Sequence, residues 1–565
     1  MKTVMKYLKP YLFPVVFCLT IKGVSAFLEL AIPRMLAIII DEDVPRGDLA
    51  AVLRNGGIML GFALLTFLFN ICGNRMAAKA TGKIARDLRH DLFEKTIRLD
   101  VSATDKFGLS SLTSRLTSDT YNITNFLARM QRIGVRAPMM LIGGVVITLT
   151  IDVKLSLVLI AILPLVSLSV YSITKRSIPM YNEEHAILDR LVRRVDESAS
   201  GIRVIKALSK VEYEKRRFHD VSEELSCREI SAGRLTSLTK PINDFIFYMG
   251  FCLVILVSAI MTKDGGATSG KLLAFMTYFT IILNNMIMMS RVFVQTSRAF
   301  SSASRIEEVL LSETELDVSE REEYKGDEYI VFDNVSFSYN KKAKNIENVS
   351  FSLKKGETLG IIGATGSGKT TLINLLLRLY DVDEGNIYIG GRNIKSIPKE
   401  ELYKTFGVAF QNDFLFRGDL RDNISFHREV SHEELSDALK ISQAEEFVNS
   451  DPNGIMREVT TGGTNLSGGQ KQRTLIARAT INDPDIIILD DSSSALDYKT
   501  DLKLRRAIKE KLKTTTVIVS QRVASVMSAD KIIVIDEGRV VGYGRHDDLL
   551  QKCEIYKQIA EVQLI

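Results

Sequence analysis

The sequence predicts a chain in two parts: an all-α membrane domain of six helices with long cytoplasmic extensions, followed by an α/β P-loop domain. Two observations predict this fold class. Long apolar stretches are confined to residues 1–300, whereas residues 320–565 alternate between short apolar strands and amphipathic helices. Within the second part, GATGSGKT follows an apolar strand and opens an apolar helix, as a phosphate-binding loop does.

The bulk composition hides this division. The 565 residues are 46% hydrophobic and 25% charged, and the net charge of +5 points to no particular partner, so no nucleic acid is expected. The five cysteines are scattered without a CxxC pair, which indicates reduced thiols: Cys18, Cys72, Cys227, Cys252 and Cys553. The N-terminal stretch runs into a long helix without a small-residue cleavage site, so no cleavable signal peptide is expected.

Six stretches are apolar enough to cross a bilayer, which takes about 20 residues. They lie near 11–40, 56–80, 128–151, 155–175, 242–262 and 271–296. The loops at 41–55, 152–154 and 263–270 are short, whereas those at 81–127 and 176–241 are long and rich in Lys and Arg. By the positive-inside rule, the long loops and the N-terminus are cytoplasmic. Apolar residues at helical spacing in the long loops predict that the spans continue as helices beyond the membrane.

Two charges interrupt the first span. Lys22 and Glu29 are seven residues apart and therefore lie on one helical face. Because charges inside a bilayer must pair or face an interior, both are expected to point inward. An ion pair between helices is favoured here over a contact with a transported substrate.

A charged connector, SETELDVSEREEYKGDE at 312–328, is expected to separate the membrane domain (1–311) from the nucleotide-binding domain (329–565). In the phosphate loop, glycines let backbone N–H groups converge on the phosphates at a helix N-terminus. Lys369 is expected to reach the outer phosphates, and the Thr370 hydroxyl to bind Mg²⁺. The residues predicted to hold the phosphates are Gly363, Thr365, Gly366, Ser367, Gly368, Lys369, Thr370 and Thr371.

Two adjacent aspartates end the apolar run IIILDD at 486–491. Asp490 is expected beside the magnesium bound at Thr370. Asp491 would then lie where an attacking water is oriented toward the γ-phosphate. Between the two motifs, NLSGGQKQRTLIARA at 465–479 opens a helix whose N-terminal N–H groups would offer a second anion site.

With these motifs in this order, the whole chain resembles a half-size ABC exporter, so the second part is expected to be an ABC nucleotide-binding domain. The resemblance implies ATP and Mg²⁺ as cofactors, with Thr370, Gln411 and Asp490 at the metal. It also implies that Tyr339 stacks on adenine, and that Ser494–Asp497 crosses to a partner. The further residues it implies at the nucleotide are Gln411, Ser467, Gly468, Gly469, Gln470 and Asp497. In the membrane half, segments 110–120 and 196–208 resemble the loops that dock on nucleotide domains.

The sequence departs from the family at two catalytic positions. The family's catalytic glutamate is replaced by Asp491, which is one methylene shorter and is expected to fall short of the attacking water. The family's histidine is replaced by Gln521, which donates a hydrogen bond but cannot become cationic. Thr461 also stands where many exporters carry a glutamate that touches the cytoplasmic loops. The signature LSGGQ at Leu466–Gln470 is nevertheless intact.

This combination predicts a subunit of an asymmetric heterodimer. A second, different ABC half-transporter would supply a catalytic glutamate. The phosphate loop of this chain would form a slow ATP site, and its signature would complete the partner's catalytic site. The chain is expected in a bacterial cell (inner) membrane, in contact with membrane lipid. The expected substrate is a small amphipathic or drug-like compound that is moved out of the cytoplasm or the inner leaflet. Span residues that could face the substrate are Phe27, Glu29, Met139, Phe247, Tyr278, Asn284, Asn285, Met286 and Met289, although helix packing explains them equally well.

Two alternatives stay open at this point. A homodimeric lipid or drug exporter would carry two identical impaired sites. An ATP-binding regulatory subunit would hydrolyse little, but it would gain little from an intact signature. The spans exclude a soluble ABC protein of repair or translation. Import is disfavoured because importers usually carry the two domains on separate chains.

Overall fold

The computed structural model describes residues 2–262, 268–312, 318, 323–341, 343–411, 413–492 and 494–564. The chain forms two compact units. Unit 1 comprises Met1–Arg98 and Phe107–Ser312, and unit 2 comprises Leu99–Lys106 and Glu313–Ile565. The short helical segment Leu99–Lys106 therefore groups with the nucleotide-binding part, which the expected division at 311 and 328 does not anticipate. Residues 263–267 of the last short loop, and 313–317 and 319–322 of the connector, lie outside the described residues.

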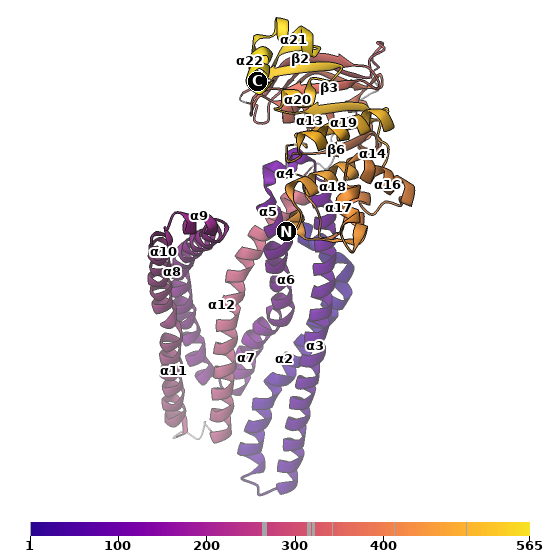
Figure 1. Ribbon diagram of the computed structural model, residues 1–565. Helices are drawn as coiled ribbons and strands as arrows, with labels where there is room; N and C mark the ends of the chain where they lie inside the picture. The colour runs from indigo at the N-terminus through magenta and orange to yellow at the C-terminus, as the bar shows by residue number, and fades with distance from the viewer. Residues whose placement is uncertain are drawn as a thin grey trace. The chain divides into compact units, whose positions relative to one another are not determined.

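The described residues of unit 1 form helices joined by short turns (Figure 1). Its elements are α1 (Lys2–Leu8), η1 (Lys9–Tyr11), α2 (Leu12–Ile38), η2 (Ile39–Asp43), α3 (Leu49–Ile97), α5 (Leu109–Ser114), η3 (Arg115–Asp119), α6 (Thr120–Arg129), η4 (Met130–Gly134), α7 (Arg136–Ile151), α8 (Val153–Ser200), α9 (Ile202–Ala207), α10 (Val211–Ser237), α11 (Thr239–Thr262) and α12 (Ser269–Leu311), with α4 (Val101–Phe107) leading in from unit 2. Six helical stretches within the described residues are long and apolar enough to cross a membrane, which confirms the six predicted spans.

The long loops of the sequence are helical extensions of the spans. α8 runs for 48 residues and α10 for 27, and α9 lies at the turn between them (Figure 1). Asp152 starts α8 by accepting from the backbone N–H groups of Lys154 at 2.8 Å and Leu155 at 3.1 Å. Close packing among the spans centres on fully buried side chains of α8 and α12, such as Leu159 and Phe275.

The two charges of the first span take different partners. Glu29 forms an ion pair at 2.7 Å with Arg136 of α7, as expected for a contact between helices. Lys22 is 2% exposed, and its Nζ donates to the side-chain oxygens of Asn70 at 2.8 Å and Asn74 at 2.9 Å on α3. Both charges therefore fasten α2 to neighbouring helices.

Unit 2 is an α/β domain with two main sheets. Its strands are β1 (Ile330–Phe337), β2 (Ile346–Leu353), β3 (Thr358–Ile362), β4 (Glu384–Ile389), β5 (Arg392–Asn393), β6 (Phe406–Ala409), β7 (Gly418–Asp419), β8 (Glu458–Val459), β9 (Ile486–Asp490), β10 (Thr515–Val519), β11 (Lys531–Asp536) and β12 (Arg539–Gly544). Its helices after α4 are α13 (Lys369–Leu376), η5 (Ile394–Ser396), α14 (Lys399–Lys404), α15 (Leu420–Ser425), α16 (His432–Ile441), α17 (Glu445–Asn449), η6 (Gly454–Met456), η7 (Thr461–Gly463), α18 (Gly468–Thr480), α19 (Tyr498–Lys511), α20 (Val523–Val526), α21 (His546–Lys552) and α22 (Glu554–Leu564).

The order of the larger sheet places the nucleotide motifs side by side. An antiparallel sheet runs β2-β1-β4-β5, and a six-stranded sheet runs β12-β11-β3-β10-β9-β6. In the six-stranded sheet, β10 lies between β3 and β9 and is parallel to both. Because parallel strands end at the same edge, the loops that follow β3, β9 and β10 meet there. The buried, β-branched residues of β9 and β10 explain why these strands occupy the centre.

Candidate functional site

The phosphate loop has the strand–loop–helix setting that the sequence predicts, between β3 and α13. Gly366 and Gly368 adopt φ values of 85° and 108°, which favour glycine. A Cβ on Gly363 would lie 2.2 Å from the carbonyl oxygen of Ile535, so a side chain is excluded there. The glycines thus allow the loop to approach phosphates closely.

Lys369 is folded back over this loop. Its Nζ donates to the carbonyl oxygens of Gly363 at 2.9 Å and Ala364 at 2.7 Å. Burial lowers the pKa of Lys369, and the nearby carboxylates of Asp490 and Asp491 oppose that shift. The ammonium group therefore already lies at the phosphate loop, and it would exchange these carbonyls for phosphate oxygens.

Asp490 ends β9 beside the first turn of α13. Its side chain is 2% exposed, and burial raises the pKa of its carboxyl, while a hydrogen bond from the Thr370 hydroxyl opposes the rise. A carboxylate and a hydroxyl side by side are oxygen ligands of the kind that Mg²⁺ takes when it also binds phosphates. The residues present therefore fit the magnesium that the sequence predicts.

Asp491 follows in a left-handed conformation, with φ at 47°. Its backbone N–H donates to Val519 at 2.9 Å, and its Oδ2 accepts from Nε2 of Gln411 at 3.2 Å. Burial raises the pKa of the Asp491 carboxyl, and the cation of Arg522 is the largest opposing influence. The structure thus brings together Gln411 and Asp491, which the sequence separates by 80 residues.

Gln521 lies in the loop after β10, and the loop is held by a residue that the sequence reasoning missed. Gln563 of α22 donates from Nε2 to the carbonyl oxygen of Gln521 at 2.9 Å. Its Oε1 accepts from the backbone N–H of Val523 at 2.8 Å. No local pattern could reveal this contact, because Gln563 is one of several polar residues on an amphipathic helix.

Tyr339 presents a partly exposed ring beside α13. Its hydroxyl accepts from Asn374 at 3.1 Å and donates to Thr371 at 3.4 Å. The ring packs edge-on against Tyr380 with centroids 5.0 Å apart. The Tyr380 hydroxyl in turn donates to Asp105, within the Leu99–Lys106 segment of the same unit.

The signature begins α18 with a capping box. The Ser467 Oγ accepts from the Gln470 N–H at 3.3 Å, and the Gln470 Oε1 accepts from the Ser467 N–H at 3.1 Å. A Cβ on Gly468 would lie 3.3 Å from that of Ala495, so the two glycines keep the helix start close to the 494–497 segment. The N-terminal N–H groups of this helix would form the second anion site that the sequence predicts.

The 494–497 segment is tied to the signature helix. Gln472 donates to Ser494 at 3.0 Å and accepts from the Ala495 N–H at 2.9 Å. Asp497 caps α19 by accepting from the Thr500 N–H at 3.0 Å. Thr461 begins a short turn that contacts the segment after Gln411, since the Gly462 N–H donates to Leu415 at 2.8 Å.

The two segments predicted to dock on nucleotide domains, 110–120 and 196–208, differ in how far they are buried within unit 1. Residues 110–120 are helical: they belong to α5, to η3 and to the start of α6. Arg115 and Asp119 contact α12, where Glu308 and Arg305 are their ionic partners. The segment that groups with the nucleotide-binding unit is Leu99–Lys106. Residues 202–207 form α9, which has no buried residue within unit 1.

Some span residues proposed to face a substrate lie in the core. Tyr278 is fully buried and donates to the carbonyl of Leu30, so it packs helices together. Met289 does line a pocket of about 260 Å³ between α6, η4, α7 and α12. The other lining residues are apolar except Thr296: Phe126, Met130, Ile133, Gly134, Ala137 and Pro138.

Known proteins resemble this chain in both of its parts. A family model described as the ABC transporter transmembrane region matches residues 15–286, and one described as ABC transporter matches residues 346–494. An uncharacterized ABC transporter ATP-binding protein of Bacillus subtilis, YfiB, is 34% identical, and the match covers 100% of this chain and 98% of the relative. An uncharacterized ABC transporter ATP-binding protein of Mycobacterium tuberculosis strain H37Rv is 31% identical over 99% and 97% of the two chains.

A solved structure shares the fold. It is described as a bacterial Atm1-family ABC exporter with ATP bound, and it superimposes with a TM-score of 0.83 over 98% of this chain and 99% of that chain. The sequence identity is 21%, so the likeness concerns the fold.

Proposed function

This chain belongs to the ABC transporter family with the architecture of a half-size exporter, and on that basis we propose that it is one subunit of a heterodimeric, ATP-driven exporter. It is a multi-pass membrane protein with a cytoplasmic nucleotide-binding domain, and a half-size exporter works as a dimer. In the proposed dimer, the phosphate loop of this chain forms a slow ATP site against the partner's signature. Its own signature completes the partner's catalytic site.

The observation that carries this proposal is the aspartate at 491. The carboxylate lies at the end of β9 next to Asp490, where it would face an attacking water, and it already accepts a hydrogen bond from Gln411. Because Asp491 is one methylene shorter than glutamate, its oxygens would stand farther from that water. A displacement of about 1 Å can lower a rate about 100-fold.

The binding groups support retention of ATP at this site. Lys369 lies at the phosphate loop, the Thr370 hydroxyl and the Asp490 carboxylate lie side by side where they would hold magnesium, and Tyr339 offers a partly exposed ring for adenine. Gln521 would contribute a neutral amide where the family has a histidine. The site therefore keeps its binding residues while both catalytic replacements weaken hydrolysis.

The signature supports the second half of the proposal. Its capping box holds Ser467 and Gln470 in place, so the helix N-terminus is ready to meet the γ-phosphate of an ATP held by a partner. Closure of the two nucleotide domains on ATP would favour an outward-open membrane cavity, because ATP binds the closed state more tightly. Hydrolysis at the partner's site would then reset the dimer.

The proposed substrate class is small and amphipathic or drug-like. The pocket of about 260 Å³ in the membrane domain is lined by Phe126, Met130 and Met289, and methionine and aromatic side chains adapt to varied apolar ligands.

The test is Mg²⁺-ATPase turnover of this chain purified alone in lipid, with ATP binding measured in parallel. We expect clear binding with almost no turnover, and loss of binding in the control Lys369→Ala. Recovery of turnover on adding a second half-transporter that co-purifies from its natural membrane would support the heterodimer. Robust turnover of the chain alone would mean that Asp491 suffices in a homodimer, and the heterodimer proposal would be wrong.

A further inference from the structure

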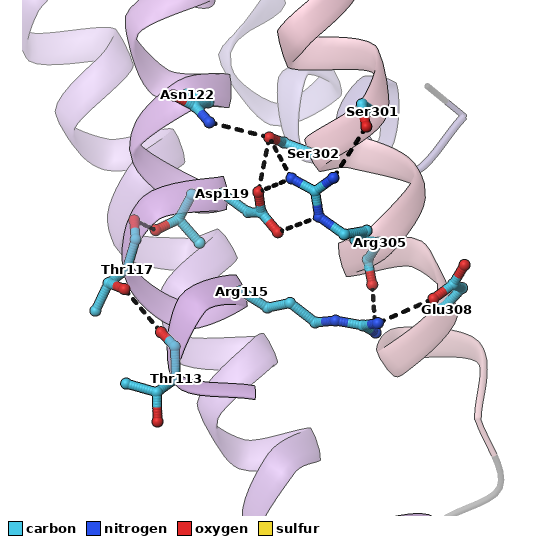
Figure 2. A network of polar contacts seen from close by, with 10 residues as sticks. Thr113, Arg115, Thr117, Asp119, Asn122, Ser301, Ser302, Arg305 and Glu308 are labelled. Carbon is cyan, nitrogen blue, oxygen red and sulfur yellow. Dashed lines mark hydrogen bonds and ion pairs between the residues drawn. The ribbon is translucent and has the colours of Figure 1, made fainter. Parts of the chain in front are cut away.

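The chain passes between its two compact units at three places, after Arg98, after Lys106 and after Ser312. The last two crossings lie far apart in sequence, and each leads directly to a helix of unit 1. Phe107 precedes α5 and η3, whereas α12 ends at Leu311. A polar cluster joins these two regions within unit 1, and we call it the η3–α12 clamp: Arg115, Asp119, Ser302, Arg305 and Glu308 (Figure 2).

Asp119 is the centre of the clamp. Its side chain is 2% exposed. Oδ2 accepts from Nε of Arg305 at 2.8 Å, and Oδ1 accepts both from Nη2 of the same guanidinium and, at 2.8 Å, from the Ser302 hydroxyl (Figure 2). A two-pronged arginine–carboxylate pair is among the stronger polar contacts in proteins. Both oxygens of this buried carboxylate therefore accept hydrogen bonds from residues of α12.

Arg115 spans the clamp from one crossing to the other. Its side chain is 9% exposed and donates to the carbonyl oxygen of Arg305 at 2.8 Å and to Glu308 at 3.1 Å. Its guanidinium also lies over the ring of Phe107, 4.7 Å from the centroid. Arg115 therefore contacts Phe107, the first residue after the crossing at Lys106, and the last turns of α12, which precede the crossing at Ser312.

The backbone between Arg115 and Asp119 is a π-helical turn. Threonine hydroxyls satisfy carbonyls around it. Thr117 donates to Thr113 at 2.7 Å (Figure 2), and Thr120 donates to Leu116 at 2.8 Å. Single π-turns within helices often occur at functional sites. Here the π-helical turn η3 carries Arg115 and Asp119, the two charged residues of the clamp that do not come from α12.

We propose that Arg115, Asp119 and Arg305 are positioning residues. They make the chain segments at the crossings after Lys106 and after Ser312 move together as one rigid body. When ATP shifts the nucleotide-binding unit, the clamp passes the displacement to α6–α7 and to α12 together. Separating a carboxylate this deeply buried from its arginine would leave a desolvated charge, so the clamp stays closed during the cycle. The proposal rests on ATP-driven transport by this family and not on the heterodimer.

The test is limited trypsin digestion of the exporter in lipid, purified with the half that assembles with it, with and without Mg²⁺-ATP and vanadate. ATP binding is measured in parallel. We expect ATP to change the cleavage rate within 176–241 of the wild-type chain at least fivefold. Asp119→Asn should bind ATP within twofold of wild type, yet show almost no such change. The exchanged pair Asp119→Arg with Arg305→Asp should recover it.

Two further variants make the result decisive. Arg298→Gln removes an exposed arginine of α12 outside the clamp and should behave as wild type. Arg305→Lys keeps the charge but loses the two-pronged geometry, so it should retain folding and lose part of the ATP-dependent change. An unaltered ATP response in both Asp119→Asn and Arg305→Lys would overturn the proposal. So would a wild-type chain without any ATP response, since no motion would remain for the clamp to transmit.

Discussion

The side-chain amide of Gln411 donates to the carboxylate of Asp491 across 3.2 Å, and this bond joins two motifs that are 80 residues apart. The family places its magnesium-sensing glutamine at one of these positions and its catalytic carboxylate at the other.

Asp491→Glu should raise Mg²⁺-ATPase turnover at this site by about 10- to 100-fold, because one more methylene carries the carboxylate toward the attacking water. Adding Gln521→His should raise it further by supplying a group that can be cationic. Turnover is measured with the partner's site inactivated, and Lys369→Ala gives the background. No gain in either the single or the double variant would remove these two positions as the cause of slow hydrolysis.

Gln563→Ala should loosen the loop that carries Gln521. The side chain makes two hydrogen bonds to that loop's backbone, each worth about 1 kcal/mol, so local opening should increase about 5- to 30-fold. Hydrogen exchange of the 519–526 peptide measures this opening. Gln558→Ala on the same helix is the control, since its amide donates to Glu554 of its own helix at 3.3 Å. Equal exchange in both variants would refute a role for Gln563.

Asp490→Asn should stabilise the nucleotide-free domain at neutral pH and abolish its stabilisation by Mg²⁺-ATP. Burial raises the pKa of Asp490 in the folded state above 3.8, so the folded state binds more protons than the unfolded state above that pH. Its contribution to stability therefore falls as pH rises through the raised pKa, and the advantage of the variant shrinks toward pH 3.8.

The control for this prediction is Asp497→Asn. Hydrogen bonds from Thr500 lower the pKa of Asp497, so its ionised form favours folding. That variant should lose stability at neutral pH, in the opposite direction to Asp490→Asn. Thermal unfolding across pH checks both, and equal signs would contradict the assignment.

Glu29→Gln should destabilise the membrane domain by about 1–2 kcal/mol, since it leaves Arg136 partly buried without its partner. The double variant with Arg136→Gln should recover part of the loss, which unfolding in mixed detergent measures. Glu94→Gln removes an exposed pair with Arg98 and should change stability by less than about 0.5 kcal/mol. An additive double variant would mean that Glu29 and Arg136 do not interact.

The parts of this molecule that depend on local pattern could be predicted from the sequence. Apolar length predicts the six spans, and the glycines and Lys369 predict the phosphate loop because each rule concerns neighbouring residues. The partners of Lys22, Asp119 and Gln521 could not be predicted. Their partners lie 40 or more residues away along the chain, and no periodicity marks those partners in the sequence.

The hydrogen bond from Tyr380 to Asp105 has a practical consequence for anyone who excises the soluble half. A fragment beginning at residue 329 would lack the Leu99–Lys106 segment, so the Tyr380 hydroxyl would lose its hydrogen bond to Asp105. Because Tyr380 packs edge-on against Tyr339, a less firmly held Tyr380 would weaken part of the support of the ring proposed to hold adenine. Affinities measured on such a fragment should understate those of the intact chain, and a synthetic peptide of residues 99–106 should restore part of the difference.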